Sequence, residues 1–380
     1  MEILKRSRPP SSTFDFTAAS IGNLFLTAAR LFSGSFESAI YLLSSICGVP
    51  SDVIRVIPAI NSNFSHHISA SLEDGTVIVG QNSISHPSEI PPFHCSPDAR
   101  KATLRELAAN DEVDQSKPHD ASPDVATTYE GDHLPGSLRS LSNKNISFSK
   151  NNNEQLPCPI SRVWYINPYG QEIRPPANPR VLDTVRESQA IIYSIGSLYT
   201  SIIPSLILRG IGQSIVTSSA RHKILILNGS LDRETGSKSH PYTGADFVEA
   251  ITRAGEESRG RKQGPREEQQ PLLPFADYVT HVLHLDGPGT PKVDREQLSR
   301  MGIETLRLYG RSVTIIDGGG KEIPIGMRYD PTALVQAIEV VLGKKGDAML
   351  RGRPGGGLSR SRRNTLECIG FRGSGRPNDE

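Results

Sequence analysis

Hydroxyl side chains gather in the middle of an uncharged stretch, AIIYSIGSLYTSIIPSLIL (190–208). Its first residues, AIIY, have the pattern of a buried strand, and an apolar helical pattern begins near Pro204. Ser197, Thr200 and Ser201 then lie between the strand's carboxyl end and the helix's amino end. Ligands of open α/β sheets bind at that edge, where free N–H groups can hold an anion. The stretch predicts a phosphate-binding loop, and an ordinary serine-rich turn is the alternative.

Gly196 in the same stretch would let the backbone approach a ligand closely. A membrane-spanning helix is another use for such an uncharged run, and its length would just suffice. However, Gly196, Pro204 and the hydroxyl residues interrupt the run, and a span here would break the strands and helices around it. We therefore predict no membrane partner.

A second candidate motif, SIGN, opens an apolar run near the amino end of the chain. Ser20 is placed to cap a helix, and Asn23 beside Gly22 could then point into a cleft. A normal capped helix explains the same residues. Both interpretations stay open on the sequence alone.

Two carboxylates follow the strand pattern HKILILNG. Asp232 and Glu234 could hold Mg²⁺ on a phosphorylated ligand, since Mg²⁺ is usually bound by one or two carboxylates together with phosphate oxygens. A solvated loop is the alternative. The sequence contains no GxSxG, HExxH or Walker motif, so spacing identifies no reaction and no metal site built from protein ligands alone is predicted.

The elements before these motifs show helical and then strand patterns. Apolar residues recur at helical spacing across Ala19–Pro50, and a break at Ser33–Ser35 predicts two helices. VIRVIPAI (53–60) predicts a short buried strand. Asp74-Gly75 between alternating runs predicts a hairpin.

From Ser161 onward strand and helix patterns alternate, as in parallel βαβ units. Runs such as ILIL and AIIY are typical of strands buried on both faces. We predict an α/β fold, a three-layer Rossmann-like parallel sheet. Strands are expected in RVWYI, QAIIYSIG, HKILILNG, YVTHVLHL and ETLRLYG, and helices in PPANPRVLDTVRES, SIIPSLILRGIGQSIVTSS and TGADFVEAITRAG, the last capped by Thr243.

Other segments have too few large apolar residues to offset the entropy of ordering. Residues 88–157 predict a disordered insertion, with DARKATLRELAAN as an isolated helix within it. Residues 344–380 predict a disordered basic tail, and GEESRGRKQGPREEQQP a charged surface insertion. IIDGGGKEIPI suggests a glycine phosphate loop, but the strand pattern after it favours a hairpin.

Composition narrows the partners. The 380 residues carry 42 Lys and Arg against 41 Asp and Glu, a net charge of +1 that gives no electrostatic footprint for nucleic acid. The four cysteines form no CxxC motif, and MEILKRSRPPSST lacks the apolar segment of a secretory signal. We predict a cytoplasmic protein with free thiols and no nucleic-acid partner.

Four segments together resemble one superfamily: GNLFLTAARLFSGSFESAIYLLSSI, LEDGTVIVGQ, IGSLYTSIIPSLIL and YTGADFVEAI. They are similar to 2-phospho-L-lactate transferase (CofD) and the YvcK-type gluconeogenesis factors, most of all to the YvcK-like branch in its fungal form. The resemblance covers roughly Phe14–Gln81 and Ser161–Gly343, and it implies one CofD-like domain in two parts, 14–87 and 158–343. It also implies ligand contacts at Gly22, Asn23, Gly196, Ser197, Leu198, Tyr199, Thr200 and Ser201.

The resemblance implies a nucleotide-type ligand. YvcK-type members resemble binders of UDP-sugars that act in carbon metabolism, so a nucleotide or sugar nucleotide is expected, with a homo-oligomer as an open question. CofD-type members imply an alternative, the transfer of a phospholactyl group from a guanosine diphosphate-activated donor to a deazaflavin alcohol with Mg²⁺. A degenerate scaffold that binds a protein partner through the basic tail is a third hypothesis.

One part of the family pattern is absent from this sequence. Family members open with a strand and a glycine-rich turn, and neither precedes Phe14. The resemblance therefore predicts a member whose first βα unit is missing, either because the sequence is truncated at its amino end or because the chain is a degenerate paralogue. Loss of that unit would expose an edge of the sheet.

Overall fold

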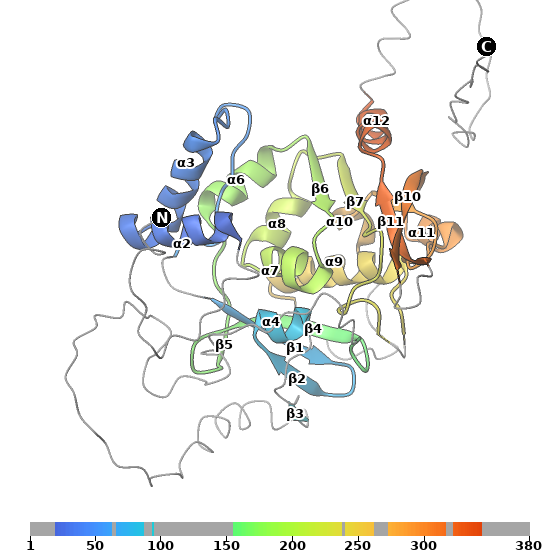
Figure 1. Cartoon of the computed structure of the whole chain (residues 1–380), viewed down its shortest axis with the longest axis horizontal. Helices are drawn as coiled ribbons and strands as arrows, with labels where there is room; N and C mark the ends of the chain where they lie inside the picture. Colours follow the sequence, from blue (N-terminus) through green and yellow to red (C-terminus); the bar gives the residue numbers. More distant parts are fainter. Residues whose placement is uncertain are drawn as a thin grey trace, which may run out of the picture.

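The computed structural model describes residues 20–62, 66–86, 93–94, 155–237, 240–261, 273–316 and 322–343. A parallel sheet and an antiparallel sheet lie on opposite sides of a helical layer, in which α7 and α9 are central (Figure 1). One apolar core joins the three, because Ile68 and Val163 of the antiparallel sheet belong to the same buried cluster as Ile251 and Val282. The predicted α/β architecture is confirmed.

The parallel sheet has four described strands in the order β6-β7-β8-β9. Leu225 and Val282 point toward the helical layer, and Ile224 and Leu283 point to the opposite face. Both faces of the central strands are covered, which explains their continuous apolar runs. The strands are β6 (Ala190–Ser194), β7 (His222–Ile226), β8 (His281–Leu285) and β9 (Glu304–Leu308).

Helices cover the two faces of the parallel sheet and produce the predicted three layers. The longest helix among the described residues, α9 (Gly244–Ser258), begins at a capping box in which Thr243 and Asp246 satisfy each other's backbone N–H groups, as the sequence predicted. α12 (Pro331–Val341) packs on the opposite face through Leu334 and Ala337. The other helices are α6 (Pro179–Glu187), α8 (Ile211–Val216), α10 (Phe275–Tyr278) and α11 (Arg295–Arg300).

The antiparallel sheet corrects one sequence prediction. RVWYI forms a strand, but this strand pairs antiparallel with β1 and does not belong to the parallel sheet. The alternation of strands and helices did not reveal this, because a strand's pattern says nothing about its partner. The predicted hairpin at Asp74-Gly75 is confirmed, and Gly75 has φ +88°. The strands, in sheet order, are β3 (Phe93–His94), β2 (Thr76–Val79), β1 (His67–Leu72), β4 (Ile160–Ile166) and β5 (Glu172–Ile173).

The two predicted amino-terminal helices are confirmed as α2 (Ile21–Ser33) and α3 (Phe36–Ile46), with Gly34 in the left-handed region between them. The predicted strand VIRVIPAI is wrong. The segment is irregular, and Val53 is 75% exposed. No strand pairs with it among the described residues. Instead, the carbonyl groups near its end accept hydrogen bonds from Asn178, the cap of α6.

The predicted helix SIIPSLILRGIGQSIVTSS is broken into shorter pieces. A π-helical turn, η2 (Leu198–Ile202), runs into α7 (Ile203–Leu206), and α8 begins after Gly210, whose φ is +101°. Arg209 forms backbone hydrogen bonds with the segment before α6, and these interrupt the helix.

The charged surface insertion was predicted to begin too early. The first four residues of GEESRGRKQGPREEQQP lie in α9, where Glu256 and Ser258 are buried.

The hairpin predicted from IIDGGGKEIPI is confirmed by β10 (Gly310–Ile316) and β11 (Glu322–Tyr329), which pair antiparallel. Within the predicted insertion 88–157 the structure describes only β3 and the residues from Gln155 onward. The helix predicted from DARKATLRELAAN and the tail 344–380 lie outside the described residues. No described helix is long and apolar enough to cross a bilayer.

A candidate ligand site at the carboxyl edge of the parallel sheet

The candidate ligand loop, Gly196–Ser201, begins two residues after β6 ends and runs into η2. It therefore lies at the carboxyl end of a parallel strand. Ser197 precedes η2 and forms no side-chain capping bond, and Ser201 is exposed. Neither hydroxyl group caps a helix, so both remain candidate donors to a ligand.

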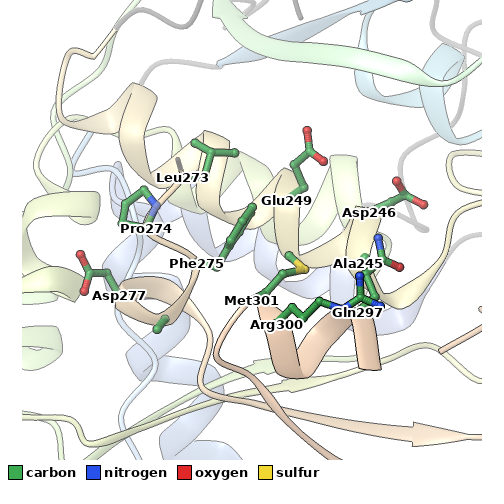
Figure 2. A pocket seen from close by; sticks show the side chains of 11 residues that line it. Ala245, Asp246, Glu249, Leu273, Pro274, Phe275, Asp277, Gln297, Arg300 and Met301 are labelled. Carbon is green, nitrogen blue, oxygen red and sulfur yellow. The ribbon is translucent and has the colours of Figure 1, made fainter. Parts of the chain in front are cut away.

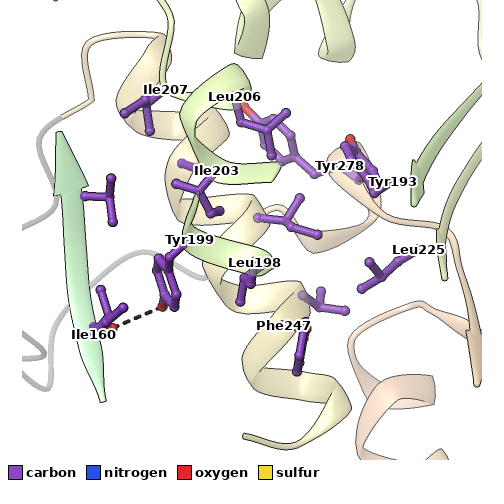
Figure 3. Packing of buried hydrophobic residues seen from close by; sticks show 14 of the residues in the cluster. Ile160, Tyr193, Leu198, Tyr199, Ile203, Leu206, Ile207, Leu225, Phe247 and Tyr278 are labelled. Carbon is purple, nitrogen blue, oxygen red and sulfur yellow. Dashed lines mark hydrogen bonds between the residues drawn. The ribbon is translucent and has the colours of Figure 1, made fainter. Parts of the chain in front are cut away.

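Leu198 and Tyr199 have their side chains in the core (Figure 3). The Tyr199 hydroxyl lies 3.0 Å from the carbonyl oxygen of Ile160 in β4 and 2.8 Å from the Tyr242 hydroxyl. Burial raises the pKa of Tyr199 well above its usual value, and the neighbouring Tyr242 adds to the effect. A ligand at this loop could reach only the backbone of these two residues.

Glu234 occupies the backbone N–H groups on which the anion prediction depended. Its Oε2 accepts from the N–H groups of Tyr199 at 2.8 Å and Thr200 at 3.2 Å. Its Oε1 accepts from the Thr200 hydroxyl at 2.5 Å and the Ser85 hydroxyl at 3.3 Å. The prediction that these N–H groups are free is wrong, because a carboxylate from the loop after β7 already satisfies them.

Glu234 is not part of a solvated loop, the alternative that the sequence left open, since it is 1% exposed. Mg²⁺ binding by its carboxylate stays a prediction. Burial raises the pKa of Glu234, and the nearby Asp232 adds to the rise. The hydrogen bonds from Thr200, Tyr199 and Ser85 oppose both effects. Among the described residues no cation forms an ion pair with Glu234. The burial of Glu234 has one signal in the sequence, the hydroxyl-rich candidate ligand loop. That loop supplies hydrogen-bond donors to a carboxylate but carries no positive charge.

Gly196 has a structural reason for being glycine. A Cβ atom built there would lie 2.6 Å from the Cβ of Ser201. The loop folds back on itself at this point, and the close approach predicted for a ligand is made by Ser201 instead. Ligand contact at Gly196 stays a prediction.

The neighbouring part of the carboxyl edge is covered by β11. The Met327 N–H donates to the Gly229 carbonyl at 2.7 Å, and the Tyr329 hydroxyl lies 2.7 Å from the carbonyl oxygen of Leu227. A Cβ at Gly229 or Gly287 would collide with Met327. Gly229 after β7 and Gly287 after β8 are therefore packed against β11. Ser194, Ile195 and Ser201 at the end of β6 are exposed.

Gly22 and Asn23 lie in the first turn of α2, which Ser20 caps, and both are exposed. The Asn23 N–H is 3.5 Å from Ser20 Oγ, and its carbonyl accepts from Thr27 at 2.8 Å. The described hydrogen bonds of the candidate ligand loop involve neither residue. The structure shows a capped helix here, and a ligand contact from Asn23 remains a prediction.

A separate hollow of about 510 Å³ lies between α9, α10 and α11 (Figure 2). Phe275 and Met301 are among its half-buried apolar residues, and Asp246, Glu249 and Arg300 are among its charged ones. No residue of the candidate ligand loop lines it. Across the described residues no three His, Cys, Asp or Glu side chains are grouped to hold a metal ion.

Comparison of the sequence with known proteins identifies a family for this chain. The sequence model of the family described as 2-phospho-L-lactate transferase CofD matches residues 4–306. An uncharacterized protein of Saccharomyces cerevisiae is 36% identical over 285 residues, which are 75% of this chain and 63% of that protein. The gluconeogenesis factor of Bacillus subtilis is 24% identical over 296 residues, 77% of this chain and 65% of that protein.

A crystal structure of a UPF0052 family protein from Bacillus halodurans has a TM-score of 0.48 at 20% identity, covering 84% of this chain and 72% of that one. The chain spans less than two thirds of the length of the first two relatives. The family match includes α2, ends within β9, and contains the candidate ligand loop and Glu234. By this match the chain belongs to the CofD family, and it is similar in sequence to the gluconeogenesis factors.

Proposed function

We propose that this chain binds a nucleotide or sugar nucleotide at the carboxyl edge of its parallel sheet. The observation that carries the proposal is the open end of β6. Its loop presents Ser197 and Ser201, while β11 packs against Gly229 after β7 and Gly287 after β8. Hydroxyl groups at such an edge, together with backbone N–H groups that Glu234 does not occupy, suit the phosphates of a nucleotide.

The relatives support a regulatory use of this binding in carbon metabolism. Several carry the name gluconeogenesis factor, and we extend that role to this chain as part of the proposal. We also propose a cytoplasmic location, in keeping with the free thiols of Cys47 and Cys158. The described residues offer no acidic cluster for a metal. We therefore propose that Mg²⁺ binds together with the ligand's phosphates, because the ion then needs only one or two carboxylates from the protein.

A thermal-shift experiment tests the binding. The full chain would be heated with a UDP-sugar or GDP plus Mg²⁺, and with uridine or guanosine as phosphate-free controls. A ligand at one hundred times its Kd stabilises the folded protein by about 2.7 kcal/mol, so a clear rise in Tm is expected for the phosphorylated ligands only. No shift with any nucleotide in a broad panel would contradict the proposal.

Point variants locate the site. Replacing Ser197 or Ser201 by alanine removes one hydroxyl donor to a phosphate, and we expect roughly tenfold weaker binding or more. Ser205→Ala is the matched control, because Ser205 is an exposed serine of the adjoining helix α7. Equal affinities for all three variants would move the site away from this loop.

The family description favours a second candidate, a phospholactyl transferase. Its test is the Mg²⁺-dependent release of a guanosine nucleotide from a guanosine diphosphate-activated phospholactyl donor in the presence of a deazaflavin alcohol. Binding of the donor without release would exclude the transferase and leave the regulatory proposal in place.

A further inference from the structure

Both oxygens of the Glu234 carboxylate accept hydrogen bonds from donors of the chain itself. Two backbone N–H groups, of Tyr199 and Thr200, share Oε2, and two hydroxyl groups, of Thr200 and Ser85, share Oε1. A carboxylate offers about four lone-pair sites. The single proton of Ser85 is shared, because Thr200 Oγ1 lies 3.2 Å from the Ser85 hydroxyl and Glu234 Oε1 lies 3.3 Å from it. A metal ion or an external ligand would therefore compete with donors of the chain at both carboxylate oxygens.

The turn that carries Glu234 is itself held from within. The Asp232 Oδ1 accepts from the Glu234 N–H at 3.0 Å, the Thr235 N–H at 3.1 Å and the Thr235 hydroxyl at 2.8 Å. A Cβ at Gly236 would lie 2.7 Å from the Asp232 carbonyl oxygen, so the turn closes tightly on itself. Glu234 is therefore delivered to the candidate ligand loop on a rigid support.

We propose that Glu234 is the positioning residue of the candidate ligand loop. It takes the place of an external anion at the N–H groups of Tyr199 and Thr200, and it fixes the backbone that presents Ser197 and Ser201 at the carboxyl edge. Ser85, at the end of α4 (Gln81–Ser85), connects the same anchor to the antiparallel sheet. What the loop binds rests on the proposed function, whereas how the loop is held does not.

The anchor also limits the chemistry of the ligand. A phosphate cannot use the N–H groups of Tyr199 and Thr200 while Glu234 holds them. It must bind through the hydroxyl groups of Ser197 and Ser201 and the backbone outside that pair. A small carboxylate such as acetate, by contrast, has the right chemistry to replace the Glu234 side chain if that side chain is removed.

Amide hydrogen exchange of the full chain without ligand tests the anchor. We expect Glu234→Ala to accelerate exchange at Tyr199 and Thr200 at least tenfold, with β7 unchanged. Glu234→Gln should stay within threefold of the wild type, because its amide oxygen can accept from both N–H groups while its NH₂ group donates to the hydroxyls. Acetate should slow exchange in Glu234→Ala but not in the wild type.

The matched control is Glu249→Ala, which removes a half-buried glutamate of α9 that pairs with Arg253. The proposal is overturned if Glu234→Ala exchanges like the wild type, or if Glu234→Gln exchanges as fast as Glu234→Ala. If Glu234→Ala does not fold, Ser85→Ala and Thr200→Val each remove a hydroxyl donor. Each should then accelerate exchange at Tyr199 and Thr200, and unchanged exchange in both would equally overturn the proposal.

Ligand binding separates this inference from the proposed function. If the exchange results hold but the wild type binds no nucleotide, the proposed function fails and the anchor stands. If the wild type binds and Glu234→Ala binds equally well, the anchor does not position the site. The expected result is a loss of affinity in Glu234→Ala that Glu234→Gln restores.

Discussion

The pKa values of two buried glutamates, Glu234 and Glu256, are shifted in opposite directions. Burial favours the neutral form of both, and their partners decide the outcome. Glu234 has only neutral donors and the nearby Asp232, so its pKa is raised. Burial would also raise the pKa of Glu256, but hydrogen bonds from Tyr278, Arg261 and Arg259 outweigh it and the pKa is lowered. As the pH falls, the contribution of Glu256 to stability should therefore decrease, and that of Glu234 should increase.

We expect Glu256→Gln to reduce the free energy of unfolding more at pH 7 than at pH 3. A carboxyl whose folded pKa lies below the ordinary value of 4.5 stabilises the fold above that value and loses its contribution as the pH falls through the folded pKa. Urea denaturation at several pH values measures the difference. A constant difference between variant and wild type across that range would show that the network does not depend on charge.

Glu234→Gln should have the opposite pH dependence. Its folded pKa lies above 4.5, so the stabilisation that proton uptake gives is complete below that value and is lost as the pH rises through the folded pKa. The glutamine variant should therefore gain stability relative to the wild type between pH 4 and pH 7. The same urea series measures this, and a relative loss of stability over that range would contradict the pKa direction.

At the scale of elements, the sequence predicted most boundaries that depend on local chemistry. Thr243 and Ser20 cap helices as expected, and Asp74-Gly75 turns a hairpin. It failed where the partner is distant in sequence. RVWYI pairs with β1, and VIRVIPAI remains without a strand partner among the described residues.

The candidate site shows the same limit. Its loop was found from hydroxyl residues after a strand pattern, but the partner that fills its N–H groups was not. Glu234 lies 34 positions from Thr200, in a turn whose composition looks solvated. Only the folded chain brings the two together, because the loops after β6 and β7 meet at one edge of the sheet.

Gly196→Ala tests how tightly the candidate ligand loop is folded. The added Cβ would lie 2.6 Å from that of Ser201, so the loop must shift, and we expect destabilisation by about 1–3 kcal/mol in chemical denaturation. Gly22→Ala is the matched control, since its Cβ would meet nothing closer than 3.7 Å. That variant should be neutral or should stabilise α2 by up to about 1 kcal/mol. Equal effects of the two substitutions would mean that the loop adapts freely.

Over the whole molecule, exposed apolar side chains are concentrated on the surface formed by α2, α3 and the segment that follows them. Phe32 is 93% exposed and Ile21 84%. Contiguous apolar patches are uncommon on monomeric proteins and often mark contacts or aggregation. The other members of this apolar surface are Leu31, Phe36, Tyr41, Leu42, Ile46, Val53, Ile54 and Val56.

We expect Phe32→Gln to reduce self-association of the purified chain. Sedimentation velocity over a range of concentrations measures the effect, since removing an aromatic ring that is 93% exposed weakens apolar contact between copies. Tyr309→Gln is the matched control, because Tyr309 is a 62% exposed aromatic residue at the end of β9, away from this surface. If Phe32→Gln leaves association unchanged, or if Tyr309→Gln reduces it equally, the chain does not self-associate through this apolar surface.

The pairing of β1 with β4 joins the two predicted parts of the CofD-like domain, 14–87 and 158–343, across the predicted insertion. Ser69 and Trp164 are register partners, and one apolar core includes residues from both sides. A covalent link between the halves is therefore not what holds them together. A protease site placed between 100 and 150 and cut after folding should leave two fragments that elute as one particle and melt in one transition. The gene could then be expressed as two separate chains that reassemble.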